Sequence, residues 1–264
     1  MSGALPVRQV AKPWGRDILP APFAAPTGER IGEIWFEPPP ELSGLLVKYI
    51  FTSEKLSVQV HPSDAQRPGH GKEECWLIVD AEPDASLGIG FREPHTPEQL
   101  RAAALDGSIE SLMEWHRVKA GDFFYIPANT VHAIGPGVSL IEVQQNSDVT
   151  YRLYEYGRPR ELHLDDGVAV AKAAPYPLAC RLIAPLGETV RLVEGPLFRL
   201  DQVTPDTLAG IAHDYAGAPL LVIPRDGTAT VAGQENAPGQ CGLALSVDDV
   251  TQTDPGTYLL AQPY

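Results

Sequence analysis

Two histidines, a glutamate and a glutamine in the first half of the chain have the residue types and spacing of a metal site. Gln59 and His61 are two positions apart in the alternating segment LSVQVH, so in a strand both side chains project from one face. Glu74 begins a second apolar run, and His132 follows a turn-rich segment. Two imidazoles, a carboxylate and an amide suit Zn²⁺, with Mn²⁺, Fe²⁺ or Co²⁺ as alternatives. Such a set leaves coordination positions open for water or substrate.

Residue types alone leave a structural alternative open at each of these positions. A single histidine in a β-sheet is more often a hydrogen-bonded packing residue than a ligand. The neighbouring Glu73 competes with Glu74, because strand alternation does not decide which carboxylate faces the histidines.

Short strands are predicted to position these side chains. The runs IGEIWF and LLVKYIF, within residues 30–51, are apolar, partly β-branched or aromatic, and bounded by turn residues. Further strands are expected over residues 56–61, 74–80, 87–91, 122–126, 132–134, 139–144 and 150–154. A chain with 24 glycines and 26 prolines has many turns, which favours short strands over long helices.

One helical segment interrupts the strands. Thr96 has the hydroxyl of an N-cap, Pro97 fits the first helical position and Gln99 the third, which predicts a helical insertion over about 96–117. We expect a first domain over 1–170 and an Ala- and Pro-rich linker over 171–185. A smaller β-rich domain, with no motif that we can assign, is expected over 186–264.

Composition excludes several functional classes. The 264 residues carry 20 basic and 34 acidic side chains, a net charge of −14, which disfavours binding to nucleic acid or to an anionic membrane. The three cysteines, Cys75, Cys180 and Cys241, are far apart and odd in number, so we expect a reducing, cytoplasmic location. No apolar run approaches the roughly 18 residues of a membrane span.

The pattern Gln59-x-His61, Glu74, Gly121-x5-Pro127-x4-His132 resembles the metal site of cupins. Cupins usually have histidine where this chain has Gln59, and glycine where it has Asn129. These departures resemble type I mannose-6-phosphate isomerases, in a short bacterial form. The segments that carry the resemblance, in order within roughly residues 10–170, are KPWG (12–15), EIW (33–35), LSVQVHP (56–62), GKEECW (71–76), IPANTVHAI (126–134), EVQQNSDVTYRLY (142–154) and RELH (160–163).

The resemblance implies a mainly β protein with a cupin (jelly-roll) barrel, the short helical insertion and a second β-rich unit. It implies one Zn²⁺ per chain, held by Gln59, His61, Glu74 and His132, and it selects Glu74 over Glu73. It also implies a reaction, the interconversion of mannose 6-phosphate and fructose 6-phosphate by proton transfer through an enediol.

Catalytic roles follow from the resemblance for four residues. Arg152 is expected to stabilise the enediolate, and Glu142 and Asp148 are candidates for proton transfer. Lys72 is a candidate for catalysis, or for binding the phosphate or a substrate hydroxyl.

Two further residues are candidates for binding substrate. Ser57 shares the predicted strand face of Gln59 and His61, and Trp14 is a candidate for the pocket wall. A non-catalytic metal- or sugar-binding cupin is the main alternative, and a cupin oxygenase is a weaker one. The sequence does not distinguish a monomer from a dimer.

Overall fold

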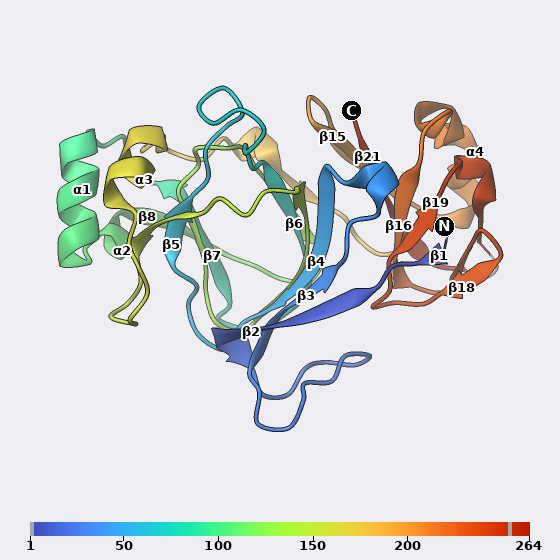
Figure 1. Ribbon diagram of the computed structural model, residues 1–264, viewed down its shortest axis with the longest axis horizontal. Helices are drawn as coiled ribbons and strands as arrows, with labels where there is room; N and C mark the ends of the chain where they lie inside the picture. Colours follow the sequence, from blue (N-terminus) through green and yellow to red (C-terminus); the bar gives the residue numbers. More distant parts are fainter. Residues whose placement is uncertain (1–2, 253–254) are drawn as a thin grey trace.

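The computed structural model describes residues 3–252 and 255–264, in which β-sheets are stacked as layers along the long axis (Figure 1). A five-stranded and a seven-stranded sheet form one half of the molecule, and a six-stranded and a three-stranded sheet form the other. Residues 1–2 and 253–254, which fall inside the two predicted domains, lie outside the described part.

The five- and seven-stranded sheets face each other and are both antiparallel throughout. In order across the sheet, the five-stranded one contains β12 (Tyr151–Tyr154), β5 (Val58–Val60), β10 (His132–Ile134), β7 (Ser86–Phe91) and β8 (Met113–Arg117). The seven-stranded one contains β13 (Arg181–Ile183), β9 (Asp122–Ile126), β6 (Glu74–Ala81), β11 (Val138–Gln145), β4 (Leu45–Phe51), β3 (Ile31–Phe36) and β2 (Val7–Arg16).

The other half also contains two sheets. Its six-stranded sheet contains β1 (Gly3–Ala4), β19 (Gly242–Ala244), β16 (Leu220–Asp226), β21 (Thr257–Pro263), β15 (Phe198–Val203) and β14 (Val190–Glu194). Its three-stranded sheet contains β18 (Gln234–Asn236), β17 (Ala229–Val231) and β20 (Val250–Gln252).

The described helices are short and peripheral. They are α1 (Pro97–Asp106), α2 (Ile109–Leu112), α3 (Leu164–Val170) and α4 (Pro205–Ile211), with 3₁₀ turns η1 (Pro40–Leu42), η2 (Leu178–Cys180), η3 (Ala212–Tyr215) and η4 (Val247–Asp249). Apolar residues of α1 and α2 pack against the outer face of the five-stranded sheet. None of the described helices has the length and apolar character needed to cross a bilayer.

Strand β4, in the interior of the seven-stranded sheet, is buried on both faces, which explains why LLVKYIF lacks alternating polarity. Every residue of β4 is buried. Val47 and Tyr49 pack in a core shared with the six-stranded sheet, whereas Lys48 and Ile50 line the space between the seven- and five-stranded sheets. Successive side chains of a strand point to opposite faces, so a central layer needs burial-compatible residues at every position.

The helical insertion is shorter than predicted. Thr96 caps α1 as expected, with its hydroxyl accepting from the Gln99 N–H and the Gln99 side chain accepting from the Thr96 N–H. Met113–Arg117 was predicted to be helical and instead forms strand β8, which pairs with β7. Pairing with β7 buries Met113, which packs with the Val58 and Val60 core, so tertiary packing outweighs the helical pattern.

Three other segments differ from the expectation. The strand predicted over Leu56–His61 is regular only at β5, so His61 lies one residue beyond it. Residues 171–185, the predicted linker, include η2 and β13, and β13 extends the seven-stranded sheet by pairing with β9. Strand β2, which the sequence analysis missed, forms the other edge of that sheet. The domain boundaries at 170 and 186 stay a prediction.

Candidate metal centre and active site

His61, Glu74 and His132 converge between the two facing sheets. Their ligating atoms all lie within 4.8 Å of one another. The Nε2 atom of His61 is 3.5 Å from Glu74 Oε2, and the Nε2 atom of His132 is 3.3 Å from Glu74 Oε1. His61 follows β5, Glu74 begins β6 and His132 begins β10, so the cluster joins both sheets.

Backbone carbonyls fix the orientation of both imidazoles. The Nδ1 atom of His61 lies 2.9 Å from the Val149 oxygen, and that of His132 lies 2.9 Å from the Thr130 oxygen. A carbonyl oxygen can only accept, so each Nδ1 carries the proton and each Nε2 presents a lone pair to Glu74. Burial lowers the pKa of both histidines, that of His61 well below its ordinary value, which favours the neutral imidazole that binds metals.

Asn129 explains one departure from the usual cupin motif. Its backbone is left-handed, with φ of 72°, a conformation that glycine adopts freely and asparagine tolerates better than most residues. In that conformation the Asn129 N–H donates to the His61 carbonyl at 2.8 Å. The turn therefore ties the segment before His132 to His61, directly after β5.

The structure places Glu74 in the cluster and directs Glu73 elsewhere. Glu73 accepts a hydrogen bond from the Tyr125 hydroxyl, outside the cluster. Glu74 is 1% exposed, and neither of its oxygens accepts a hydrogen bond of normal geometry from the described residues. A buried carboxylate beside two Nε2 lone pairs, with the Lys72 ammonium as its only ion-pair partner besides the histidines among the described residues, forms a donor set that fits a divalent transition metal.

Lys72 balances the charge of Glu74. Its ammonium lies 2.7 Å from Glu74 Oε2 and 3.1 Å from His61 Nε2, and the residue is 6% exposed. Burial on its own would raise the pKa of Glu74, but Lys72 and His132 lower it overall. Lys72 is thus a buried part of the cluster, in contrast to the exposed position that is usual for a lysine after a glycine-rich loop.

Gln59 lies beside the cluster on β5. Its Nε2 atom is 3.2 Å from His132 Nε2, and its Oε1 atom accepts from the Ser57 hydroxyl at 3.1 Å. Rotation of the amide by 180° would turn its oxygen toward His132 and the centre of the cluster. Register explains the proximity, because Gln59 pairs with His132 of β10 on one side and with Arg152 of β12 on the other.

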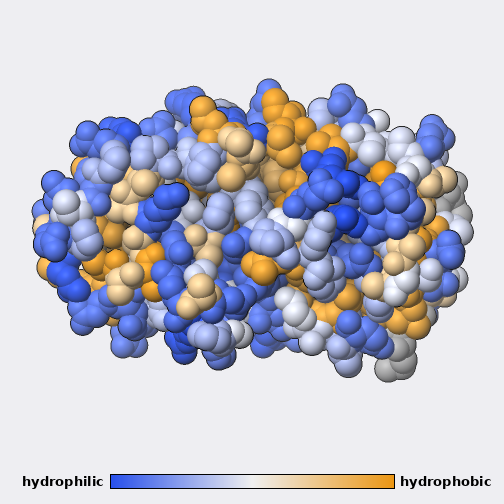
Figure 2. All heavy atoms as spheres, turned by 90° about the horizontal axis from the view of Figure 1, so that it is seen from above, coloured by the Kyte–Doolittle hydropathy of each residue, from blue (hydrophilic) through white to orange (hydrophobic). Residues whose placement is uncertain are grey.

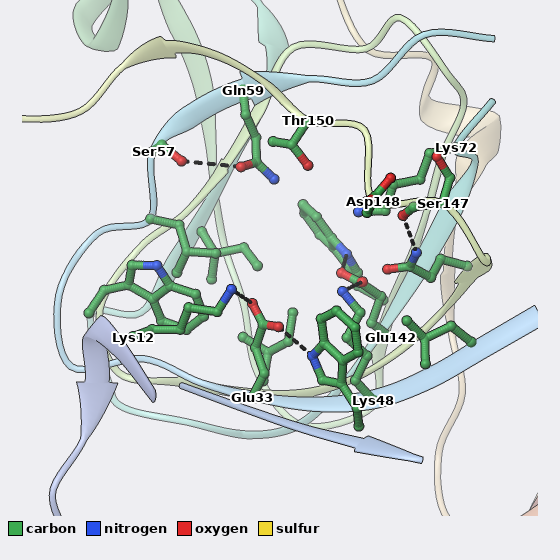
Figure 3. Close-up of a pocket in the computed structure, with 18 of the residues that line it drawn as sticks. Lys12, Glu33, Lys48, Ser57, Gln59, Lys72, Glu142, Ser147, Asp148 and Thr150 are labelled. Atoms are coloured by element: carbon green, nitrogen blue, oxygen red, sulfur yellow. Dashed lines mark hydrogen bonds and ion pairs between the residues drawn. The ribbon is translucent and has the colours of Figure 1, made fainter. Parts of the chain in front are cut away.

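A polar cavity of about 160 Å³ adjoins the cluster (Figure 3). Seven residues predicted for catalysis, substrate binding or metal binding line it: Trp14, Ser57, Gln59, Lys72, Glu142, Asp148 and Arg152. The buried His61, Glu74 and His132 contact its lining through Gln59 and Lys72. The structure therefore gathers all ten predicted site residues in one place.

Several lining residues were not predicted to belong to the site, and they are mostly charged or polar: Lys12, Glu33, Trp35, Lys48, Gln144, Thr150 and Arg160. Lys48 carried a usable signal, because a lysine in the middle of LLVKYIF has to be buried if that run is a central strand. Glu33 begins the EIW segment and likewise interrupts an apolar run.

Two lysines of the cavity are paired with carboxylates, whereas Arg152 pairs with none in the described part of the chain. Lys12 pairs with Glu33 at 3.0 Å, and Lys48 pairs with Glu142 at 2.7 Å. Arg152 has a buried Nε with no hydrogen-bond partner in the described chain, and burial and the neighbouring Arg160 lower its pKa. Two adjacent guanidiniums that repel each other form a favourable position for an anion.

The two facing sheets and the His–Glu–His cluster define a cupin-type protein with a candidate metal centre, and the predicted fold class is confirmed. No family model matches the chain. The chain is similar to mannose-6-phosphate isomerases, which confirms the resemblance inferred from its motifs.

Two curated relatives carry that name. The chain is 43% identical over 144 residues to mannose-6-phosphate isomerase ManA of Bacillus subtilis, across 50% of this chain and 45% of that protein. It is 39% identical over 170 residues to mannose-6-phosphate isomerase of Streptococcus mutans, across 58% of this chain and 52% of that protein. The match thus spans about half the length of these relatives.

Solved structures extend the similarity in fold to the whole chain. The crystal structure of mannose 6-phosphate isomerase from Bacillus subtilis superposes with a TM-score of 0.74 at 22% identity, covering 99% of both chains. A mannose 6-phosphate isomerase bound with zinc and yttrium superposes with a TM-score of 0.71 at 14% identity, covering 99% of both chains.

Proposed function

We propose that the protein is a metal-dependent aldose–ketose isomerase that interconverts mannose 6-phosphate and fructose 6-phosphate. The observation that carries the proposal is the buried His61–Glu74–His132 cluster beside a cavity lined by charges of both signs. Two curated relatives are named mannose-6-phosphate isomerase, which supports mannose 6-phosphate as one of the two sugars.

We assign the metal to His61, Glu74 and His132, with Gln59 as a fourth ligand after rotation of its amide. Two imidazoles with a carboxylate favour Zn²⁺, and open positions are left at such a site. When bound, the ion supplies a Lewis acid that polarises the sugar oxygens at C1 and C2. Lys72, which lies beside Glu74 and His61, would donate to a sugar oxygen bound next to these ligands.

We assign the anionic parts of the reaction to the two guanidiniums. Lys12, Lys48 and Lys72 are each paired with a carboxylate of the site. Arg160 shares Glu155 with Arg158, and the Nε of the neighbouring Arg152 has no hydrogen-bond partner among the described residues, so this end of the cavity can attract an anion. We assign the phosphate to Arg160 and the hydroxyl of Ser57, which both line the cavity. Arg152 pairs across strands with Gln59 next to the metal ligands, where it stabilises enediolate charge.

We assign proton transfer to Asp148 over Glu142. Both carboxylates line the cavity, but the two oxygens of Glu142 already face Lys48 and Trp76. Asp148 is exposed, and its side chain makes no hydrogen bond or ion pair that competes for it among the described residues. In the forward direction Asp148 removes the proton from C2 and returns it to C1, while a proton passes from the C2 hydroxyl to the C1 oxygen.

A coupled assay for fructose 6-phosphate formed from mannose 6-phosphate tests the proposal. Turnover is expected from purified protein, is lost after chelation and returns on addition of Zn²⁺. Absence of turnover with one equivalent of metal bound would overturn the isomerase. Binding of free sugars or uptake of dioxygen would then favour the binding cupin or the oxygenase.

A matched pair of variants locates the metal. His132→Ala is expected to lose bound metal and turnover together. His116→Ala, on β8 of the same sheet and outside the cavity lining, is expected to retain both. Equal metal content in the two variants would remove His132 from the ligand set.

A further inference from the structure

A buried ion pair lies in the cavity wall opposite the five-stranded sheet. The Lys48 ammonium is 2.7 Å from Glu142 Oε1, and the two residues are 6% and 3% exposed. The other oxygen of Glu142 accepts the indole N–H of Trp76 at 2.9 Å. Both carboxylate oxygens are therefore held from opposite sides, by β4 and by β6.

Strand register places the pair in one row across the sheet. Trp35 of β3 pairs with Lys48, Lys48 pairs with Glu142, and Glu142 pairs with Trp76. All four line the cavity, and Figure 3 shows Lys48 and Glu142 together at its floor. The Lys48 ammonium also lies 5.1 Å from the centre of the Trp35 ring, over which a cation is favourable.

Lys48 remains protonated in this environment. Burial alone would lower its pKa, but Glu142 and Glu33 raise it to about 12. Lys48 therefore stays charged beside Glu142 and keeps the ion pair.

Stability alone does not account for a buried ion pair at this place. Desolvation offsets most of the attraction in such a pair, and well-packed apolar residues are often as stable. The opposite face of the same strands uses apolar residues, including Val47 and Val143. The charged pair instead lines a cavity whose proposed ligand carries several hydroxyl groups.

We propose that Lys48 is a positioning residue that acts through Glu142, fixing this carboxylate as an acceptor for the sugar hydroxyls. The inference rests on the proposed function. A carboxylate oxygen has lone pairs beyond the one that each donor uses, so Glu142 can accept substrate hydroxyls while Lys48 and Trp76 hold it. Glu142 then orients the sugar, and proton transfer remains with Asp148.

A double-mutant cycle between Lys48→Met and Glu142→Gln tests the inference. Each single variant is expected to lower kcat/KM by about 30- to 100-fold with bound metal retained, the size of loss that misorientation of substrate causes. The double variant is expected to be no worse than Glu142→Gln, because Lys48 acts only through that side chain. Losses that multiply would overturn the proposal.

Two further variants keep the result interpretable. Lys48→Met leaves a buried carboxylate unpaired and can unfold the protein, whereas the double variant contains no unpaired charge at this pair. Lys48→Arg keeps the donor and is expected to restore most of the kcat/KM lost in Lys48→Met. Lys12→Met is the matched control, since Lys12 pairs with Glu33 and its effect should multiply with Glu142→Gln.

Calorimetric binding of mannitol 6-phosphate, which cannot isomerise, separates this inference from the proposed function. An inactive wild-type holoenzyme would overturn the isomerase. Even then, about tenfold weaker binding of the analogue in each single variant, with no further loss in the double variant, would support the positioning role. Unchanged affinity in all three variants would reject it.

Discussion

The two faces of the seven-stranded sheet differ although the same strands form both. Toward the five-stranded sheet, Lys48, Glu74 and Glu142 project into the cavity region, where they meet other charged or hydrogen-bonding groups. Toward the six-stranded sheet, their chain neighbours Val47 and Val143 lie in an apolar core. One residue of shift in register would exchange the two faces completely.

Within a single strand, residues that stabilise the fold therefore alternate with residues that line the proposed site. The apolar face joins the seven-stranded sheet to the six-stranded sheet of the second unit, including Leu200, Ile223 and Leu259. The second unit, whose sequence carries no assignable motif, thus supports the back of the wall that bears Glu74 and Glu142. Burial of apolar surface there offsets the cost of placing charges on the other face.

The largest expected effect comes from Glu74 on the polar face. Glu74→Ala removes the carboxylate that contacts both histidines, so we expect loss of bound metal and a fall in turnover of about 10³-fold or more. Cys75→Ala is the matched control, because Cys75 points into the apolar core. Metal analysis and the coupled assay would compare metal content and turnover in the two variants. Retention of metal by Glu74→Ala would show that Glu74 is not a ligand.

Arg152 is expected to separate metal binding from catalysis. Arg152→Ala keeps His61, Glu74 and His132 in place but removes the guanidinium next to Gln59, so turnover should fall by about 10²- to 10³-fold with metal content unchanged. Arg158→Ala serves as control, since Arg158 pairs with Glu155 and Glu54 and does not line the cavity. Equal kcat in the two variants would remove Arg152 from the mechanism.

The apolar face should show the opposite response. Leu77, 1% exposed, packs in the core between the seven- and six-stranded sheets. Leu77→Ala is expected to lower the free energy of unfolding by about 2–5 kcal/mol, as deletion of a buried leucine usually does. Metal content and kcat at 25 °C should stay unchanged, and chemical denaturation would measure the loss. A matching loss of metal affinity would show that the faces are not independent.

Motif spacing predicted the site better than periodicity predicted the elements. Strand alternation was enough to put Gln59 and His61 on one face, and the resemblance to a known motif grouped them with His132, which pairs with Gln59 across strands. The Lys48–Glu142 pair needed the register of β4 against β11, residues 94 positions apart, which one sequence does not contain. Lys72 was identified from its motif, but its ion pair with Glu74 depends on burial that only the folded chain reveals.

The errors in the fold prediction have a common physical origin. Met113–Arg117 has a plausible helical pattern but completes an edge of the five-stranded sheet. Strand β2 begins with exposed residues, so its sequence lacks the apolar pattern of a strand. Its extended conformation depends on pairing with β3. In both cases a neighbouring strand supplies the stabilisation, which local propensity does not describe.

The smallest expected effect concerns Glu33, a buried acid at the edge of the polar face. Burial alone would raise the pKa of Glu33, but Lys48, Lys12 and the Trp35 indole lower it below its ordinary value near 4.5. A lowered pKa in the folded state means that the unfolded chain binds the proton more tightly. Glu33 therefore stabilises the fold fully above about pH 4.5, and this contribution is lost as the pH falls toward its folded pKa.

Glu33→Gln should make the stability of the fold depend less on pH below about 4.5. Glutamine keeps an acceptor for Trp35 but not the charge, and Lys12 is partly exposed and can turn to solvent, so the cost at pH 7 should be about 1–2 kcal/mol. Thermal melts from pH 7 to pH 3 would compare it with Glu37→Gln, where the exposed pair with Arg8 predicts almost no change. The gap between wild type and Glu33→Gln should narrow as the pH falls. A constant gap would mean that Glu33 contributes shape and hydrogen bonding but no net charge stabilisation to the polar face.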